Sequence, residues 1–320
     1  MSRCLVDSEY LNLKGKTKKQ HYVPQFLLRN FSVGRKQKAK VWVYDKSKGK
    51  RFRASVRDVG HENAFYEACA PDGRVLEAEP LTAHIDDRGS KAIELILKRG
   101  ALPLNSREMV DLSYFAAFQM LRTPDVRASM EYMRTQIIEK WGPDVMAEGD
   151  EKPVSDYTYE DSKLSSLMFL QDAPEFAKIL QSKIHFLTEC PPGSRFLISD
   201  NPVVKHNYLD YGHRGSLGIA QKGIHVFLPL SSRYCLEYIC PEMADRLSDT
   251  AYGQCMLMKQ NLGLPWQCKP ENVEFVNSLQ VIQSERWIYG QNQEDLMIAE
   301  DMVKEQPDLS IPASNKTIRK

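Results

Sequence analysis

The sequence predicts an α+β protein with a central, mostly antiparallel sheet, a helical block and an N-terminal basic hairpin. Helical patterns run together between residues 76 and 182, whereas β-rich runs gather between residues 184 and 239. Segregation of helices from strands is typical of α+β folds rather than of alternating β–α–β folds. The 320 residues are 42% hydrophobic and 27% charged, an ordinary globular composition that can supply a packed core.

Composition also narrows the class of protein. The seven cysteines are odd in number and form no Cys-x-x-Cys pair, which argues against a disulfide framework and a structural zinc site. Because the sequence has neither an apolar signal region nor a run of about 18 apolar residues, we expect a cytoplasmic protein without a membrane span. The net charge of +1 provides no global field that would attract nucleic acid or a membrane.

The N-terminal part combines a polar arm, a short helix and a hairpin. Residues 1–19 are polar and rich in lysine, so we expect a flexible basic arm. Pro24 suits the first position of a short helix that reaches about residue 30. Residues 41–44 predict a strand, and a Lys-Ser-Lys-Gly-Lys turn leads to a second strand near Phe52, which completes the basic hairpin.

Helices dominate the next part of the chain. One helix is expected from about residue 76 to 98, ended by Gly100, and the next begins at Asn105, where Glu108 completes a capping-box pattern. Pro124 ends or kinks this second helix, because the residue before a proline avoids the helical region. Further helices are predicted over residues 125–140 and 163–182, separated by an acidic loop at residues 148–161.

Strand patterns follow the helices. The β-rich runs, bounded by Pro, Gly and Ser, cover residues 184–188, 195–199, 224–230 and 234–239. Residues 231–233 form a tight turn between the last two runs.

The C-terminal part returns mainly to helix. Pro270 opens a helix to about residue 284, residues 286–289 predict a strand, and a last amphipathic helix covers residues 293–304. We therefore expect one α+β domain over residues 20–305 and a disordered tail over residues 306–320.

Three segments carry a family resemblance. They are HYVPQFLLRNF at residues 21–31, QMLRTP at residues 119–124 and ISDNPV at residues 198–203, hereafter the motif segments. Together with FLPLS at 227–231 and RWIY at 286–289, they resemble a bacterial family filed as domain of unknown function 4238, over roughly residues 19–290. The resemblance implies a single family-sized unit, and it implies no catalytic assignment.

His21, Gln25 and Arg29 form the first candidate site. Gln25 and Arg29 are four residues apart, so they lie on one face of the predicted helix, and His21 precedes that helix. A histidine, an amide and a guanidinium grouped in this way can bind an anion, helped by free backbone N–H groups. The alternative is that these side chains cap the helix and pin it to the next element.

Gln119 and Arg122 form the second candidate site. They are three residues apart on one face of an otherwise apolar helix. A buried arginine needs a carboxylate or phosphate partner, because an unpaired buried charge is costly. That partner is either an anionic ligand or, in a structural salt bridge, Glu77 or Glu79.

Ser199, Asp200 and Asn201 form the third candidate site. Asp200 falls at the C-terminal end of a buried strand, and Pro202 pushes Asn201 into an extended shape. Strand ends are places where sheets present functional carboxylates. The alternative is an Asx-type turn that stops the strand.

Glu77 and Glu79 are candidate metal ligands. They lie two residues apart before Pro80, and together with Asp200 they would make a carboxylate set suited to Mg²⁺ or Mn²⁺. The alternative is that they complement the macrodipole at a helix start.

We expect these polar residues to meet, because each adjoins apolar neighbours and isolated buried polar groups are costly. A cleft that holds them would suit hydrolysis of phosphodiester bonds, by a metal-dependent or a histidine-based route. The predicted catalytic residues are His21, Gln25 and Asp200, and the predicted substrate-binding residues are Arg29, Gln119, Arg122, Ser199 and Asn201. In this hypothesis Asp200 orients His21 or binds a metal.

The basic segment adds a second argument for a nuclease. Residues 35–57 hold ten Lys and Arg side chains, interleaved with Trp42, Tyr44 and Phe52, a pattern that suits phosphate contact and base stacking but also any solvated hairpin. No common nucleotide-binding, serine-hydrolase or zincin motif occurs. Two alternative functions stay open: a non-catalytic protein that binds a nucleotide-like or anionic ligand, and a partner-interaction protein whose polar network is structural.

Overall fold

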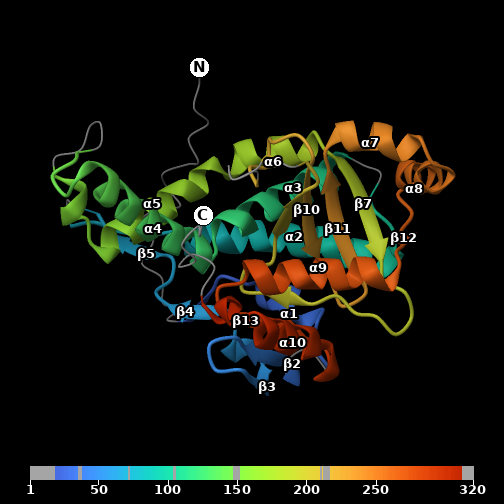
Figure 1. The fold of residues 1–320 in the computed structure, drawn as a ribbon, viewed down its shortest axis with the longest axis horizontal. Coiled ribbons are helices and arrows are strands. Elements are labelled where there is room, and N and C mark those ends of the chain that lie inside the picture. Colours follow the sequence, from blue (N-terminus) through green and yellow to red (C-terminus); the bar gives the residue numbers. More distant parts are fainter. Residues whose placement is uncertain are drawn as a thin grey trace.

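A computed structural model describes residues 19–34, 38–70, 73–103, 106–146, 152–209, 211 and 217–311. Residues 1–18 of the predicted arm and the predicted cap Asn105 lie outside the described residues. The prediction of an α+β fold with mostly antiparallel strands is confirmed (Figure 1). The strands divide between two larger sheets, which the sequence pattern did not distinguish.

The larger sheet has five strands in the order β12-β7-β11-β10-β9, and every neighbouring pair is antiparallel except β12 with β7. Its strands are β7 (Ile184–Glu189), β9 (Val204–Asn207), β10 (Ile224–Pro229), β11 (Tyr234–Ile239) and β12 (Trp266–Gln267). Strands β10 and β11 are buried along their whole length, so the sheet is covered on both faces.

The smaller sheet has four strands in the order β3-β2-β13-β8. The predicted basic hairpin is β2 (Lys40–Asp45) and β3 (Lys50–Ser55). Its inner strand pairs with β13 (Trp287–Gly290), which also pairs with the two-residue β8 (Ile198–Ser199). The hairpin is therefore joined to a strand from the far end of the chain (Figure 1).

The helical block covers one face of the larger sheet (Figure 1). It consists of α2 (Glu79–Arg99), α3 (Ser106–Leu121) and α6 (Ala173–Gln181), and α3 packs against both of the others. Gly100 ends α2 as predicted, in the left-handed conformation with a φ of 63°. Helix α2 starts later than predicted, because β6 (Val75–Glu77) pairs with β5 (Glu67–Cys69) as a hairpin.

Two further helices extend this block at one end of the molecule (Figure 1). They are α4 (Pro124–Trp141), which resumes at Pro124 as predicted, and α5 (Tyr159–Phe169). The predicted continuous helix over 163–182 is wrong, since η5 (Leu170–Asp172) separates α5 from α6. A proline follows in the first turn of α6, where it is tolerated and where the preceding chain has to change direction.

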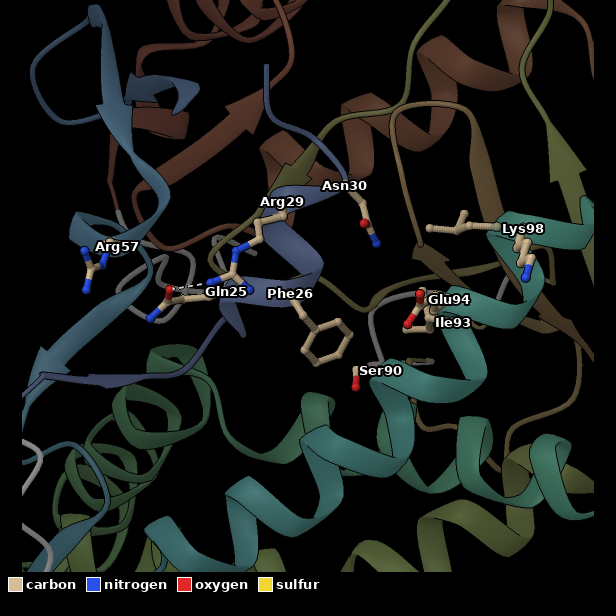
Figure 2. A pocket seen from close by; sticks show the side chains of 10 residues that line it. Gln25, Phe26, Arg29, Asn30, Arg57, Ser90, Ile93, Glu94 and Lys98 are labelled. Atoms are coloured by element: carbon tan, nitrogen blue, oxygen red, sulfur yellow. Dashed lines mark hydrogen bonds between the residues drawn. The ribbon is translucent and has the colours of Figure 1, made fainter. Parts of the chain in front are cut away.

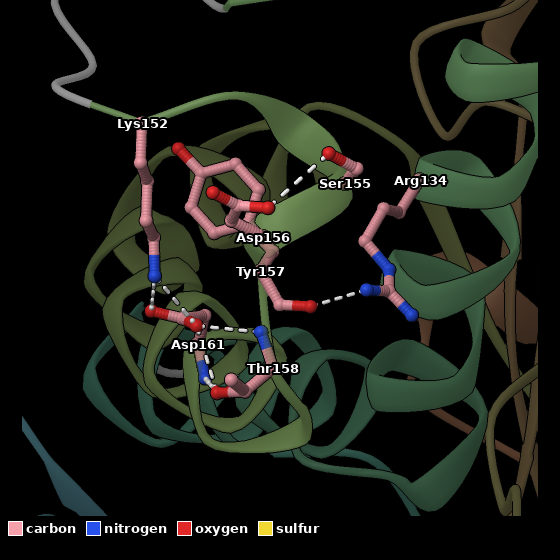
Figure 3. A network of polar contacts seen from close by, with 7 residues as sticks. All are labelled: Arg134, Lys152, Ser155, Asp156, Tyr157, Thr158 and Asp161. Carbon is pink, nitrogen blue, oxygen red and sulfur yellow. Dashed lines mark hydrogen bonds and ion pairs between the residues drawn. The ribbon is translucent and has the colours of Figure 1, made fainter. Parts of the chain in front are cut away.

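The start of α5 is fixed by a capping box (Figure 3). The Thr158 side chain accepts from the Asp161 N–H, and the Asp161 carboxylate accepts from the Thr158 N–H at 2.6 Å. Lys152 Nζ lies 2.9 Å from the same carboxylate. The predicted acidic loop at 148–161 therefore ends in a helix start, while residues 148–151 lie outside the described residues.

The opposite face of the larger sheet is covered by helices from the C-terminal third. These are α7 (Pro241–Ser248) and α8 (Ala251–Asn261), which the sequence analysis did not assign, and α9 (Pro270–Gln283), which it predicted. Helix α10 (Met297–Glu305) lies against the smaller sheet and α9, close to its predicted bounds (Figure 1). Residues 307–310 of the predicted tail form η7 with Leu309 buried, and residues 312–320 lie outside the described residues.

The N-terminal elements lie between the helical block and the smaller sheet. They are β1 (Lys19–His21), which pairs with β4 (His61–Asn63), and α1 (Gln25–Arg29), which begins one residue after its predicted first position, because Pro24 is the N-cap. Short 3-10 turns also occur at η3 (Val56–Asp58), η4 (Val154–Asp156) and η6 (Glu294–Leu296). No helix in the described ranges combines the length and the apolar character that a bilayer crossing requires.

The close approach of α2 and α3 yields a first prediction. A Cβ atom added at Gly89 would lie 2.5 Å from the Phe115 ring, which itself packs on Phe26 of α1. Gly89→Ala should therefore lower the free energy of unfolding by roughly 1–2 kcal/mol, although alanine normally favours a helix interior. Urea unfolding measures the change. The control Lys91→Ala, at an exposed position of α2, should stay within about 0.5 kcal/mol, and a stabilised Gly89→Ala variant would contradict the packing argument.

Candidate functional site

The three motif segments converge on Tyr22, the residue that follows His21. Gln119 Nε2 donates to the Tyr22 carbonyl at 2.8 Å, which joins the first two segments. Burial and then the negative charge of Asp200 raise the pKa of the Tyr22 phenol, so the third segment lies nearby. The convergence is therefore inside the core: Tyr22 is 3% exposed and Asp200 is 1% exposed.

The Arg122 guanidinium is the centre of the second candidate site. Its side chain is fully buried, Nη2 lies 2.6 Å from Asp86 Oδ1, and Nε donates to Gln119 Oε1 at 2.8 Å. The ring faces of Phe115 and Phe118 lie 5.6 and 5.3 Å from the guanidinium carbon. The alternative of a structural salt bridge is thus the one the geometry favours, and its partner is Asp86 rather than Glu77 or Glu79.

The predicted metal ligands do not come together with Asp200. Glu77 lies on β6 and Glu79 at the start of α2, and burial, followed by the nearby Asp86 carboxylate, raises the pKa of Glu79 to about 7. Within the described part of the chain, no three His, Cys, Asp or Glu side chains are placed to hold a metal ion. The described residues therefore do not support the predicted Mg²⁺ or Mn²⁺ site of Glu77, Glu79 and Asp200.

The Asp200 carboxylate is occupied by backbone donors. It accepts N–H bonds from Glu285 at 2.9 Å, from Arg286 at 2.7 Å and from Trp287 at 2.8 Å. Burial raises the pKa of Asp200 to about 6, while these three donors favour the carboxylate and limit the rise. Asp200 thereby fixes the chain that connects α9 to β13. It also follows the end of β8, as the alternative of a strand-stopping residue predicted, but its partners are these distant N–H groups.

The residues on either side of Asp200 also contact α9. Ser199 Oγ donates to Gln280 Oε1 at 2.7 Å, and Asn201 Nδ2 donates to the Gln283 carbonyl at 3.1 Å. Ser199 is fully buried and Asn201 is 9% exposed. The hydrogen bonds of these predicted substrate-binding residues are thus used to fix α9 on β8.

His21 has a different environment from the other motif residues. Its ring centroid lies 5.1 Å from that of His61, and its Nε2 atom makes no hydrogen bond. Burial, followed by His61, lowers the pKa of His21 to about 4, so the imidazole is neutral at pH 7. The ring also contacts the backbone of Val56 and Arg57 in η3. His21 is thus a weak proton acceptor whose Nε2 is buried, and Asp200 does not orient it.

Gln25 and Arg29 line a cavity of about 1070 Å³ between α1 and α2 (Figure 2). Arg29 Nη2 donates to Gln25 Oε1 at 2.9 Å, so the amide holds the guanidinium in place. Arg57 of η3 and Lys98 of α2 complete a cationic lining, and Glu94 is the acidic residue of that lining. We call this space the α1–α2 cavity. Of the predicted site residues, Gln25 and Arg29 line it.

Two residues of this cavity escaped the sequence analysis as site residues. Arg57 was one of ten basic residues in the segment 35–57, and Lys98 marked the end of a helix. Neither position carried a signal of its own, because their proximity arises only when η3 and α2 come to lie on either side of α1.

The basic hairpin offers fewer ligand contacts than its sequence suggests. Lys46 is buried, and its Nζ donates to the carbonyls of Val281 at 2.9 Å and Ser284 at 2.7 Å. Tyr44 is 1% exposed, so its ring is unavailable for stacking, whereas Phe52 is 40% exposed.

The sequence matches a known protein family. A family model described as protein of unknown function (DUF4238) matches residues 19–294, a range that contains all three motif segments and every strand of the two larger sheets. No curated protein and no solved structure gave a match.

Removing the partner of Arg122 tests whether the ion pair is structural. Asp86→Ala leaves a buried guanidinium without its carboxylate, so the free energy of unfolding should fall by roughly 3 kcal/mol. The control Asp87→Ala removes an exposed carboxylate that pairs with Lys91, and should cost less than about 0.5 kcal/mol. Urea unfolding of both variants decides, and equal losses would contradict the assignment.

Proposed function

The chain belongs to the DUF4238 family of proteins of unknown function, and we propose that it binds a phosphate-bearing ligand in the α1–α2 cavity. One observation carries the proposal: Arg29, Arg57 and Lys98 surround a space of about 1070 Å³ that has Glu94 as its acidic lining residue. A cleft lined mainly by one sign of charge concentrates ligands of the opposite sign.

The cations of this cavity are available to a ligand. Within the described ranges, Arg29, Arg57 and Lys98 form no ion pair with a carboxylate, and all three side chains are exposed. A guanidinium binds a phosphate through two parallel N–H donors, and Arg29 is already oriented by Gln25. The alternative of binding without catalysis therefore has more support than hydrolysis at this place.

Nucleic acid is the ligand we propose for the longer surface around the cavity. Arg57 lies at the end of the basic segment 35–57, and Lys40, Lys50 and Arg53 of the adjoining hairpin are also exposed. Exposed Phe52 adds one aromatic face. A strand of phosphates could follow these cations from the cavity along the hairpin.

Hydrolysis of a phosphodiester bond is the second candidate function, and the position of His21 next to Arg57 favours it. Its imidazole is neutral at pH 7, but its Nε2 is buried and its pKa is lowered to about 4, so a base role requires that substrate binding exposes this nitrogen. Its contact with the backbone of Arg57 places it beside a residue that lines the cavity. Asp200 and the predicted metal have no part in this version.

Binding is tested by fluorescence anisotropy with a labelled single-stranded DNA at several salt concentrations. Arg29→Ala and Arg57→Ala should each weaken binding about fivefold or more and reduce the dependence of log K on log salt, because each removes one phosphate contact. The control Lys91→Ala, outside the cavity, should change neither value. Weakening by Arg53→Ala alone would move the site to the hairpin, and unchanged binding in all variants would contradict the proposal.

Hydrolysis is tested with a panel of labelled DNA and RNA substrates. His21→Gln should reduce cleavage by about 100-fold or more while the thermal unfolding midpoint stays close to that of the unchanged protein. The matched control is His84→Gln, an exposed histidine of α2. Cleavage that survives in His21→Gln, or that is absent from the unchanged protein, would leave ligand binding as the function.

A further inference from the structure

A second cavity, of about 280 Å³, lies on the face of the larger sheet that α7, α8 and α9 cover. The strand register separates this face from the one under the helical block. Phe227 and Glu237 are paired across β10 and β11 and point to the second cavity, whereas Tyr234 of β11 meets α2 at Gly100. We call this space the sheet cavity, and none of its lining residues belongs to the α1–α2 cavity.

The floor of the sheet cavity holds a buried histidine and a buried carboxylate. His225 Nε2 lies 2.9 Å from Glu237 Oε2, and the two side chains are 8% and 11% exposed. Despite this distance, the Nε2 atom has no aligned hydrogen-bond partner. Buried polar groups are normally satisfied, so an incompletely bonded pair in a cavity wall indicates a place for a ligand.

The walls of the sheet cavity are aromatic. The rings of Phe227 and Phe275 lie 6.1 Å apart in an edge-on arrangement, and those of Tyr252 and Trp266 lie 4.7 Å apart. Trp266 Nε1 donates to the Tyr252 hydroxyl at 3.2 Å, which fixes these two side chains relative to each other. A flat apolar group therefore meets preformed ring surfaces from β10, β12, α8 and α9.

The acidic residue of the sheet cavity is Glu237, which lies beside His225. Glu237 is the carboxylate among the lining residues, which include no lysine or arginine. Its field is felt on both sides, because burial and then Glu237 raise the pKa of Tyr208 and of Cys268, each to about 12. Lys259 approaches the Trp266 ring to 5.4 Å but does not line the cavity.

We propose that the sheet cavity binds a small aromatic ammonium compound, with its ring among Phe227, Trp266 and Phe275 and its cation on Glu237. The volume is slightly below the usual range for ligand pockets, about 300–1000 Å³, so the ligand is small. An anion would be repelled by Glu237, whereas an ammonium group would give that carboxylate a second partner beside His225. Aromatic rings add a favourable interaction with a cation.

Three probes of nearly equal shape test this site in the full chain: phenethylammonium, 2-phenylethanol and phenylacetate. Isothermal titration calorimetry should show phenethylammonium binding at least about tenfold more tightly than the alcohol, and phenylacetate most weakly. This order of affinities is measured on the unchanged protein, so it does not require that a variant folds. Equal affinity for the ammonium and the alcohol, or no binding of either, would overturn the proposal.

Variants then locate the binding. Glu237→Gln should bring the ratio of ammonium to alcohol affinity close to one, whereas the matched change Glu274→Gln, at an exposed position of α9, should leave it unaltered. Met256→Trp places a larger ring from α8 into the cavity and should abolish binding of all three probes. Unchanged binding in Met256→Trp would show that the probes bind elsewhere and would overturn the proposal.

The proposal stands apart from the proposed function. Arg29→Ala, which removes a cation from the α1–α2 cavity, should leave phenethylammonium binding unchanged. If Glu237→Gln fails to fold, the probe series and Met256→Trp still decide between the two outcomes.

Discussion

The ion pair of Arg122 with Asp86 joins α2 to the end of α3 within the helical block, and Gln119, which is bonded to Arg122, extends this contact to the N-terminal segment. Arg122 is fully enclosed, so its charge is tolerated only because Asp86, Gln119 and the surrounding rings replace water. Gln119 in turn donates to the Tyr22 carbonyl, which places β1 and α1 on the helices. Helices α1 and α2 also form the walls of the α1–α2 cavity, so the shape of this cavity depends on the buried Arg122, which does not line it.

The motif segments therefore have a structural role, since their hydrogen bonds hold neighbouring elements together around Tyr22. The second segment attaches to the first through Gln119, and the third, through Asp200, holds the backbone that leads into β13. Because β13 pairs with the hairpin strand β2, the same carboxylate indirectly sets where the basic hairpin lies. The buried polar groups of the motif segments do lie close together, because isolated buried polar groups are costly. They lie in the core, however, and most of their hydrogen bonds are made within the protein.

The two cavities differ in the residues that line them: cationic side chains line the α1–α2 cavity, whereas aromatic side chains and one carboxylate line the sheet cavity. The α1–α2 cavity is wide and lined by exposed cations, which suits a hydrated anion that is attracted over a distance. The sheet cavity is smaller and aromatic, with one buried carboxylate that interacts strongly because little water screens it. One chain could thus bind two ligands of opposite charge without competition between them.

Local pattern alone determined the class of fold, the hairpin, the helix starts at Pro24, Pro124 and Pro270, and the Gln25–Arg29 pair, since these depend on spacing and on backbone chemistry within a few residues. The partner of Arg122, the backbone donors around Asp200 and the meeting of Arg29 with Arg57 were decided by tertiary structure alone. So was the sheet cavity, in which Glu237 contacts His225 and faces α8 and α9. Such contacts join segments separated by tens to hundreds of residues, and which polar group satisfies which depends on how the helices pack on the sheets.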